Sequence, residues 1–275
     1  YLSPEHQPAC YAFIDEWNAS TEQEKLFEIA DDITERMRLT ERLEKVDTAI
    51  LMQSDSLPCI DAIIIERFLQ EIAENVIKTE EILKVTESRR TSKWYNRYAY
   101  LYDGLYYIAK MQEFHYAHIT GFHFGTEKEL WDSYCKELYW MDTYYRRLYM
   151  DFRKSLFNTL ETLDDLFKSA VVTAEHLYQN WYLSELNGSW NSLIKESVAD
   201  GFSQNGILQQ DDFYRRVVQP IARESRVFVI ISDALRYEVA TELTEKLLRE
   251  TNGTAKQSAM QSVFPSITKF GMAAR

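Results

Sequence analysis

The sequence predicts a mainly α protein whose last 50 residues begin an α/β domain. No proline occurs between Pro58 and Pro220, and no glycine between Gly125 and Gly188, so long helices can form without their usual interruptions. Apolar residues of the first 200 positions recur at alternating spacings of three and four, which is the period of an α-helix. The run RVFVIIS at 226–232 is instead typical of a strand buried on both faces.

The helical period is clearest in three stretches. The first two each step by 4, 3 and 4, which places their apolar residues on one helix face: Leu39, Leu43, Val46 and Ile50, then Ile65, Leu69, Ile72 and Val76. The third is a longer stripe that continues less regularly beyond its last member: Trp131, Tyr134, Leu138, Met141, Tyr145, Leu148 and Phe152. A stripe of this length needs a partner helix, and residues 94–108 supply one. We therefore expect residues 1–205 to be a multi-helix region with at least one long antiparallel hairpin, its turn within 118–130.

The C-terminal part has a different pattern. Residues 206–225 are predicted as a connecting segment with a helix that stops near Pro220. A strand at 226–232, a helix over 233–250 ended by Asn252-Gly253 and a second apolar stretch at 259–264 follow. This order predicts a β-α-β unit with two parallel strands and a right-handed crossover. Because two strands do not make a stable domain alone, residues 226–275 are expected to be the truncated start of an α/β domain.

Composition restricts the classes of partner. The 31 basic and 43 acidic side chains give a formal charge of -12, which disfavours nucleic-acid binding by this segment without excluding it. The basic cluster of Arg89, Arg90, Lys93 and Arg97 is interpreted as a solvated helix face. The 18 tyrosines favour a helix-packing core, with a stacking platform for single-stranded nucleic acid or a partner surface as the alternative.

Cysteine usage and hydropathy indicate the compartment. The three cysteines are far apart and show no zinc-binding spacing, which is typical of a reduced, cytoplasmic protein. No apolar run approaches the ~18 residues that a membrane-spanning helix needs, and the N-terminal residues lack a signal-peptide pattern. A cytoplasmic protein without a membrane partner is therefore expected.

Polar side chains follow both predicted strands at their carboxyl ends. Ser232, Asp233 and Arg236 follow the first, and Ser266, Thr268 and Lys269 follow the second. In open α/β sheets ligands bind at this edge, so we expect Asp233 and Thr268 to meet there. A carboxylate is a ligand for a divalent ion, and a hydroxyl on the same ion becomes a nucleophile near neutral pH. The alternative is that Asp233 only caps a helix, as such residues often do.

The two motifs resemble a known family. VFVIISDALRYEVATEL, followed after roughly twenty residues by VFPSITKFGMAA, is similar to the opening of the PglZ domain. This domain is a branch of the alkaline phosphatase superfamily found in bacterial phage-growth-limitation and BREX phage-defence systems. The specific resemblance covers about 50 of the 275 residues, and the preceding helices are similar only in texture.

The resemblance implies roles for individual residues. Asp233 falls where the superfamily has its first metal-binding aspartate, and Thr268 where it has the metal-bound nucleophile. Arg236 and Lys269 are candidates for orienting a phosphate. The superfamily holds two divalent ions, such as zinc, manganese or magnesium, with further Asp and His ligands far downstream, and none of the five histidines here follows Thr268. We therefore expect no tightly bound metal and little or no activity from this part alone.

Two functions remain open at this point. The first is a metal-dependent phosphohydrolase that acts on phosphate mono- or diesters through Thr268. The second is an interaction scaffold whose helical region docks other components of the defence complex. A phospho-acceptor or adhesion-type metal site at Asp233 is a weaker third, because the residues before it are apolar and DALRY lacks the DxSxS pattern.

Overall fold

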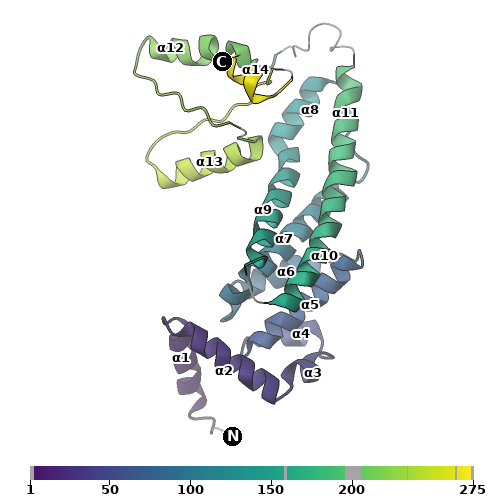
Figure 1. The fold of residues 1–275 in the computed structure, drawn as a ribbon, viewed down its shortest axis with the longest axis vertical. Coiled ribbons are helices and arrows are strands. Elements are labelled where there is room, and N and C mark those ends of the chain that lie inside the picture. Colours follow the sequence, from purple (N-terminus) through teal and green to yellow (C-terminus); the bar gives the residue numbers. More distant parts are fainter. Residues whose placement is uncertain (1–2, 158–159, 196–205, 234, 264, 274–275) are drawn as a thin grey trace. The chain divides into compact units, whose positions relative to one another are not determined.

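The computed structural model describes residues 3–157, 160–195, 206–233, 235–263 and 265–273. The predicted mainly α class is confirmed (Figure 1). The chain forms two compact units: Tyr1–Ala117 with Tyr144–Tyr178 is unit 1, and His118–Thr143 with Gln179–Arg275 is unit 2. The boundaries predicted at residues 205 and 225 stay a prediction.

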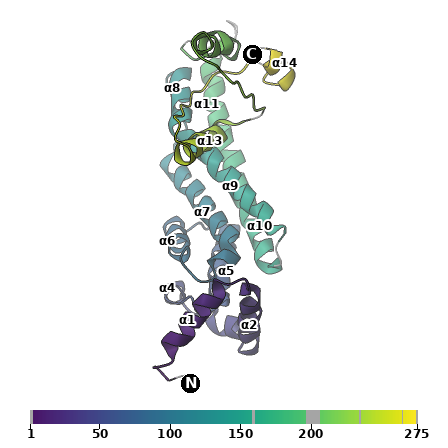
Figure 2. The ribbon, with the colours of Figure 1, turned by 90° about the vertical axis from the view of Figure 1, so that its left-hand side faces the viewer.

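Unit 1 is built from helices. They are α1 (Gln7–Asn18), α2 (Gln23–Arg36), α3 (Leu39–Leu43), α4 (Thr48–Leu51), α5 (Pro58–Ala73), α6 (Thr79–Arg89), α7 (Tyr95–Ala117), most of α9 (Tyr139–Ser155) and α10 (Glu161–His176). Helices α5 and α10 lie side by side, as do α6 and α7 (Figures 1 and 2). Several apolar side chains in this core are fully buried, at 0% exposure: Ile64, Ile65, Leu69, Ile72, Leu101, Leu105, Ile108 and Phe167.

The predicted antiparallel hairpin is visible within unit 1. Arg147 of α9 donates a hydrogen bond to the Tyr107 hydroxyl of α7 at 3.3 Å. The Lys110 ammonium of α7 lies 6.0 Å from the ring centre of Tyr144 in α9. One helix therefore advances while the other returns, so α7 and this part of α9 run antiparallel.

The helix expected from Leu39 to Ile50 is interrupted. Helix α3 ends at Leu43, and α4 starts at Thr48 because the Asp47 side chain accepts a hydrogen bond from the Ala49 backbone N–H at 2.8 Å. An N-cap of this kind starts a new helix in a different direction. Ile50 is consequently 58% exposed instead of lying on a shared buried face.

One member of the basic cluster is not solvated. Arg89 is 3% exposed and donates to the carbonyls of Leu51 and Ser54, at 3.1 and 2.9 Å. Its Nε lies 3.5 Å from Asp61, which is 0% exposed and accepts a hydrogen bond from the Tyr102 hydroxyl at 2.5 Å. Arg90, Lys93 and Arg97 each form an ion pair with a nearby carboxylate, but their side chains are 45%, 22% and 18% exposed. The prediction of a solvated face therefore holds at Arg90, holds only in part at Lys93 and Arg97, and fails at Arg89.

Unit 2 contains shorter elements. They are α8 (Glu127–Ser133), the π-helix η1 (Tyr134–Leu138), the first residues of α9, most of the π-helix η2 (Leu177–Leu183), α11 (Ser184–Ile194), η4 (Gln210–Asp212), the π-helix η5 (Tyr214–Val218), α12 (Gln219–Ala222), α13 (Tyr237–Glu250) and α14 (Thr268–Ala273). Helices α8 and α11 lie side by side (Figures 1 and 2). The Thr126 hydroxyl caps α8 by accepting from the Glu129 backbone N–H at 3.2 Å.

The predicted parallel strands are not formed in the part of the chain that the structure describes. Residues 226–232 and 259–263 carry no strand, and Phe264 of the second expected strand lies outside the described residues. One parallel bridge joins Gln209 and Gln261 instead. Phe228 and Ile230 are 82% and 93% exposed, because the described residues provide no second strand to cover a segment predicted to be buried on both faces. The helix between them, α13, is confirmed.

No helix among the described residues combines the length and the apolar character needed to cross a bilayer.

Candidate functional site

The structure brings together the two residues on which the predicted chemistry depends. The Thr268 hydroxyl donates a hydrogen bond to Oδ2 of Asp233 at 3.0 Å, although the two residues are 35 positions apart. Both side chains are exposed, and Thr268 is the first residue of α14. The expected meeting of Asp233 and Thr268 is therefore found even though the sheet that was to align them is not formed.

A buried glutamine holds the segment that carries Thr268. Gln210 is 7% exposed, and its side chain donates to the Gly271 carbonyl at 2.9 Å and accepts from the Val263 backbone N–H at 3.2 Å. Its backbone N–H donates to the Gln261 carbonyl at 2.9 Å. Gln210 thus fixes the chain on both sides of Thr268. Sequence reasoning missed it, because a glutamine in a predicted connecting segment gives no signal of its own.

Arg236 is directed toward other carboxylates than Asp233. Its terminal nitrogen lies 2.9 Å from Oδ1 of Asp142, and its Nε lies 3.1 Å from Oε1 of Glu238. Asp142 and Glu238 are 4% and 0% exposed, whereas the Arg236 side chain is 52% exposed. The guanidinium therefore compensates two buried negative charges. Its predicted contact with a phosphate stays a prediction.

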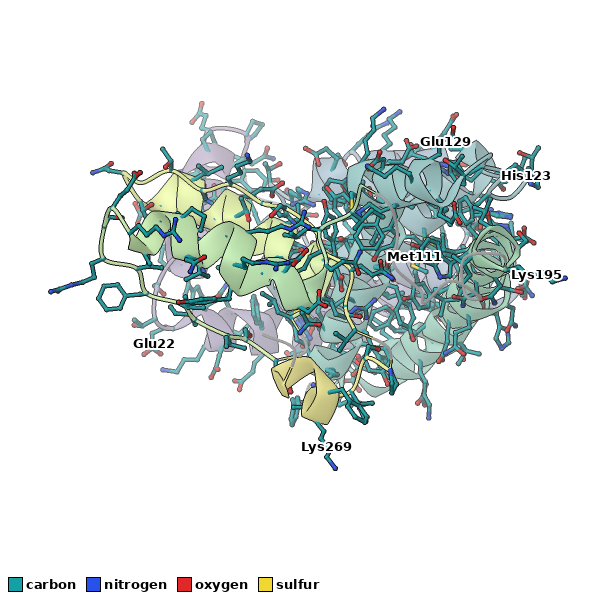
Figure 3. All side chains as sticks on the ribbon, turned by 90° about the horizontal axis from the view of Figure 1, so that it is seen from above. Glu22, Met111, His123, Glu129, Lys195 and Lys269 are labelled. Carbon is teal, nitrogen blue, oxygen red and sulfur yellow. The ribbon has the colours of Figure 1, made fainter. Side chains whose placement is uncertain are left out.

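Lys269 is placed differently from Arg236. It is exposed on α14, next in sequence to Thr268, and its side chain extends away from the ribbon in Figure 3. An ammonium on a flexible four-carbon stem can reach an anion near the start of the helix. Its predicted role as a phosphate-orienting charge also stays a prediction.

The carboxylate of Asp142 is surrounded by donors. The hydroxyls of Tyr134 and Tyr182 lie 2.8 and 3.2 Å from its Oδ2, opposite the Arg236 contact on Oδ1. Burial, together with the negative charge of Asp142, raises the pKa of Tyr134 well above its ordinary value, so this hydroxyl keeps its proton and donates. The tyrosines of the Trp131–Phe152 stripe thus include one with a polar function, which the periodic pattern could not distinguish.

A cavity of about 550 Å³ lies beside these residues in unit 2. Its wall includes Trp131 and Tyr237 from helices, and Ile230, Ser232, Met260 and Ser262 from the two segments predicted as strands. Ser232 directly precedes Asp233, but neither Asp233 nor Thr268 contributes to the wall. The cavity is mostly apolar and corresponds to the space beside the unpaired strand segments.

The donor set of the site fits a divalent ion in kind but not in number. A carboxylate and a hydroxyl are hard oxygen donors suited to such ions. Within the described ranges, however, no group of three or more His, Cys, Asp or Glu side chains is arranged to hold a metal. Asp233 and Thr268 can therefore supply part of a coordination shell and need further ligands from elsewhere.

Comparisons with known proteins define the class. Residues 213–275 match the family described as the BREX system PglZ alkaline phosphatase-like domain. The chain is 30% identical over 287 residues to the alkaline phosphatase-like protein BrxZ of Escherichia coli O9:H4 (strain HS), an alignment that covers 99% of this chain and 32% of that protein. It is 29% identical over 257 residues to the alkaline phosphatase-like protein PglZ of Bacillus cereus (strain H3081.97), covering 93% of this chain and 29% of that protein.

These matches support a PglZ-family protein of the BREX type, and the resemblance noted from the two sequence motifs is confirmed. The similarity extends over the helices as well, which the motifs alone did not establish. The chain spans about a third of the length of these curated relatives. No solved structure is significantly similar to it.

Proposed function

We propose that the protein is a metal-dependent phosphohydrolase of BREX-type phage defence, in which Asp233 is a metal ligand and Thr268 is both ligand and nucleophile. The observation that carries the proposal is the 3.0 Å hydrogen bond between these two side chains. The family resemblance selects the same two residues independently, as the first metal-binding aspartate and the nucleophile.

The chemistry follows from the direction of that hydrogen bond. Because the Thr268 hydroxyl donates to Asp233, its proton points at a carboxylate and its oxygen lone pairs are exposed to a substrate. Thr268 Oγ1 gives up its proton and forms a bond to phosphorus while the ester P–O bond breaks, and the departing alkoxide takes up a proton and leaves as the alcohol. Water then hydrolyses the phosphothreonine and regenerates the hydroxyl. A divalent ion, when bound, would lower the pKa of the hydroxyl and neutralise charge on the phosphate oxygens.

The metal requirement is part of the proposal. We propose two divalent ions, zinc, manganese or magnesium, as in the superfamily that the sequence resembles. Asp233 and Thr268 alone offer two donors, which is too few to hold such an ion tightly, so tight binding requires ligands other than those described here.

The proposal gives Lys269 and Arg236 different roles. Lys269 is exposed beside Thr268 on α14, so we propose it as the charge that orients the phosphate. Arg236 already faces two buried carboxylates, and a direct contact with substrate would have to compete with them.

The test is hydrolysis of nitrophenyl phosphate mono- and diesters by the whole protein, with zinc, manganese or magnesium added in turn. Thr268→Ala removes the nucleophile and should lower kcat by at least about 10³-fold. Thr268→Ser is the matched control, because it keeps the hydroxyl and should retain much of the activity. Since the side chain is exposed, the free energy of unfolding should change by no more than about 0.5 kcal/mol in either variant. Undiminished hydrolysis by the Thr268→Ala protein would refute the nucleophile assignment.

A second candidate function is a docking scaffold for other components of the defence system. Three apolar side chains spaced four apart along and just after α2 favour it, because Ile29, Ile33 and Met37 are 46%, 39% and 53% exposed. Co-expression of the whole protein with the other proteins encoded in its own defence system tests this. Ile33→Lys should release a partner that binds here, and Glu35→Lys, an exposed position on the opposite face of the same helix, is the charge control. Unchanged co-purification of every component with Ile33→Lys would exclude this surface.

A further inference from the structure

Five side chains of unit 2 form a polar cluster around one buried carboxylate. The Asp142 cluster consists of Tyr134, Asp142, Tyr182, Arg236 and Glu238. Its central carboxylate is 4% exposed and has contacts of 2.8, 3.2 and 2.9 Å from the two tyrosine hydroxyls and the Arg236 guanidinium. Both oxygens of a buried carboxylate are thus satisfied, which is costly to arrange and costly to disturb.

The two tyrosines come from unusual backbone. Tyr134 begins the π-helix η1, and Tyr182 lies in the π-helix η2. The Tyr182 hydroxyl also lies 3.0 Å from the Leu138 carbonyl at the end of η1. π-Helical turns are rare and are frequently found at functional sites. Here two of them place their hydroxyls on one carboxylate, so the helices of this unit are shaped around Asp142.

Arg236 connects this carboxylate to the candidate site. Arg236 follows Asp233 by three residues. Because an extended chain advances at most about 3.6 Å per residue, the Asp233 backbone stays within about 11 Å of the Arg236 backbone. The next residue is held too, because the Tyr237 hydroxyl donates to the Cys135 carbonyl of η1 at 2.9 Å. The Tyr237 ring also lies 5.8 and 5.5 Å from the rings of Tyr134 and Tyr139. The residues after Asp233 are therefore tied to the helices at two successive positions.

We propose that Asp142 is a positioning residue for the candidate site: by holding Arg236 it fixes the segment that presents Asp233 to Thr268. The inference rests on the proposed function, since it assigns Asp142 a part in the same site. It gives the helices a role in catalysis without contact with substrate. It also assigns the Arg236 guanidinium a structural part, because its charge compensates the buried carboxylates of Asp142 and Glu238.

The alternative use of Arg236 makes the opposite prediction. If the guanidinium binds the phosphate directly, Asp142 competes with the substrate for it. Asp142→Asn would then leave activity unchanged or improve KM, and Arg236→Gln would act mainly on KM. If Asp142 positions the site, both variants lower kcat with little change in KM, because the geometry of Asp233 and Thr268 is lost in each.

The experiment measures kcat and KM of the whole protein for nitrophenyl phosphate with metal added. Asp142→Asn and Arg236→Gln should each lower kcat about 10- to 100-fold, the range found when residues behind metal ligands are changed. The double variant should be no slower than the slower single variant, because each single variant already removes the contact between Asp142 and Arg236. Asp132→Asn is the matched control, since Asp132 lies on α8 of the same unit, is 59% exposed and pairs with Lys128. Wild-type kcat in Asp142→Asn, or additive losses in the double variant, would overturn the proposal.

A second measurement separates this inference from the proposed function. Amide hydrogen exchange at residues 235–240 should be faster in Asp142→Asn than in Asp132→Asn, whatever the activity. If Thr268→Ala retains activity, the proposed function fails while the exchange result still decides on the Asp142 contact. If Asp142→Asn does not fold, Tyr182→Phe removes one donor and keeps the ring, and it should lower kcat and protection in the same direction by a smaller factor. No change in either quantity would refute the positioning role.

Discussion

Two isoleucines show how differently the two ends of this chain are built. Ile65 on α5 is 0% exposed, whereas Ile230 in the segment predicted as a strand is 93% exposed. Both stand in strongly apolar stretches of sequence. A helix satisfies its backbone hydrogen bonds internally, so it only needs neighbours for its side chains, and α7 and α10 supply them. A strand needs neighbours for its backbone as well, and residues 226–232 have none among the described residues.

The carboxylates show the same difference. Asp61 is sealed in unit 1 between Arg89 and Tyr102 and is 0% exposed. Asp233 is exposed in unit 2 and meets the hydroxyl of Thr268. Asp61 is closed to any ligand, whereas a side chain that binds a metal or a substrate directly has to be accessible. The comparison therefore separates the part of the chain that stabilises from the part that presents chemistry.

The largest expected effect is on the packed core. Ile65→Ala should lower the free energy of unfolding by about 2–5 kcal/mol, because it removes buried methyl groups and leaves a cavity. Ile230→Ala is the matched control and should change it by no more than about 0.5 kcal/mol. Denaturant unfolding of both variants measures this. Equal losses would show that residues 226–232 are as well packed as α5 in solution, and would remove the basis of the comparison.

A smaller effect is expected at the contact between α7 and α10. A Cβ added at Gly104 would lie 2.4 Å from the ring of Phe167, which is itself 0% exposed and cannot move freely. Gly104→Ala should therefore cost about 1–3 kcal/mol of stability through overpacking. Gly188 on α11 has no atom within 4 Å of the same added carbon, so Gly188→Ala should stabilise by up to about 1 kcal/mol. Thermal unfolding distinguishes them, and a stabilising Gly104→Ala would contradict the close approach of the two helices.

The smallest expected effect is the pH dependence that burial gives to Asp61. Burial raises the pKa of Asp61 above its ordinary value of 3.8, while Arg89 and the Tyr102 hydrogen bond oppose the shift only in part. Between the unfolded and the folded pKa the folded state binds more protons. The contribution of Asp61 to stability is therefore present below pH 3.8 and is lost as pH rises through the folded pKa.

Asp61→Asn removes this titration. Denaturant unfolding of both proteins between about pH 4 and pH 7 should show the wild type losing stability relative to the variant as pH rises. The two proteins are compared by the slope of the free energy of unfolding with pH. The variant also leaves the Arg89 charge without its partner, which lowers the free energy of unfolding at every pH. Parallel curves, or a wild type that gains relative stability with rising pH, would contradict a raised pKa for Asp61.

Several features could be predicted from the sequence because they depend on neighbours along the chain. The 3-4 spacing of Ile65, Leu69, Ile72 and Val76 predicted one buried helix face. The first three are 0% exposed, whereas α5 ends at Ala73, so Val76 is off the helix and 47% exposed. Helix α13 and the approach of Asp233 to Thr268 were also expected. The same reasoning missed the interruption at Asp47, because one capping side chain outweighs a weak period in a short helix.

Other features depend on residues far apart and had no local signal. Arg89 appeared as one of four surface cations, yet it is buried against carbonyls of Leu51 and Ser54. Gln210 and Asp142 were not selected, since a glutamine in a connecting segment and an aspartate on a helix are ordinary residues in sequence. Their importance comes from partners 53, 61 and 94 positions away, at Val263, Gly271 and Arg236.

The sequence by itself determined the mainly α class, helix α13 and the two residues of the candidate chemistry, because periodicity, caps and motifs act within a few residues. Only the tertiary structure decided which charges are buried and paired, and which apolar stretch remained without neighbours. Burial and ion pairing depend on which distant segments meet, and the free energy of a strand depends on a second strand. Arg236 shows this most clearly: the sequence placed it three residues after Asp233, and the fold directs it to Asp142.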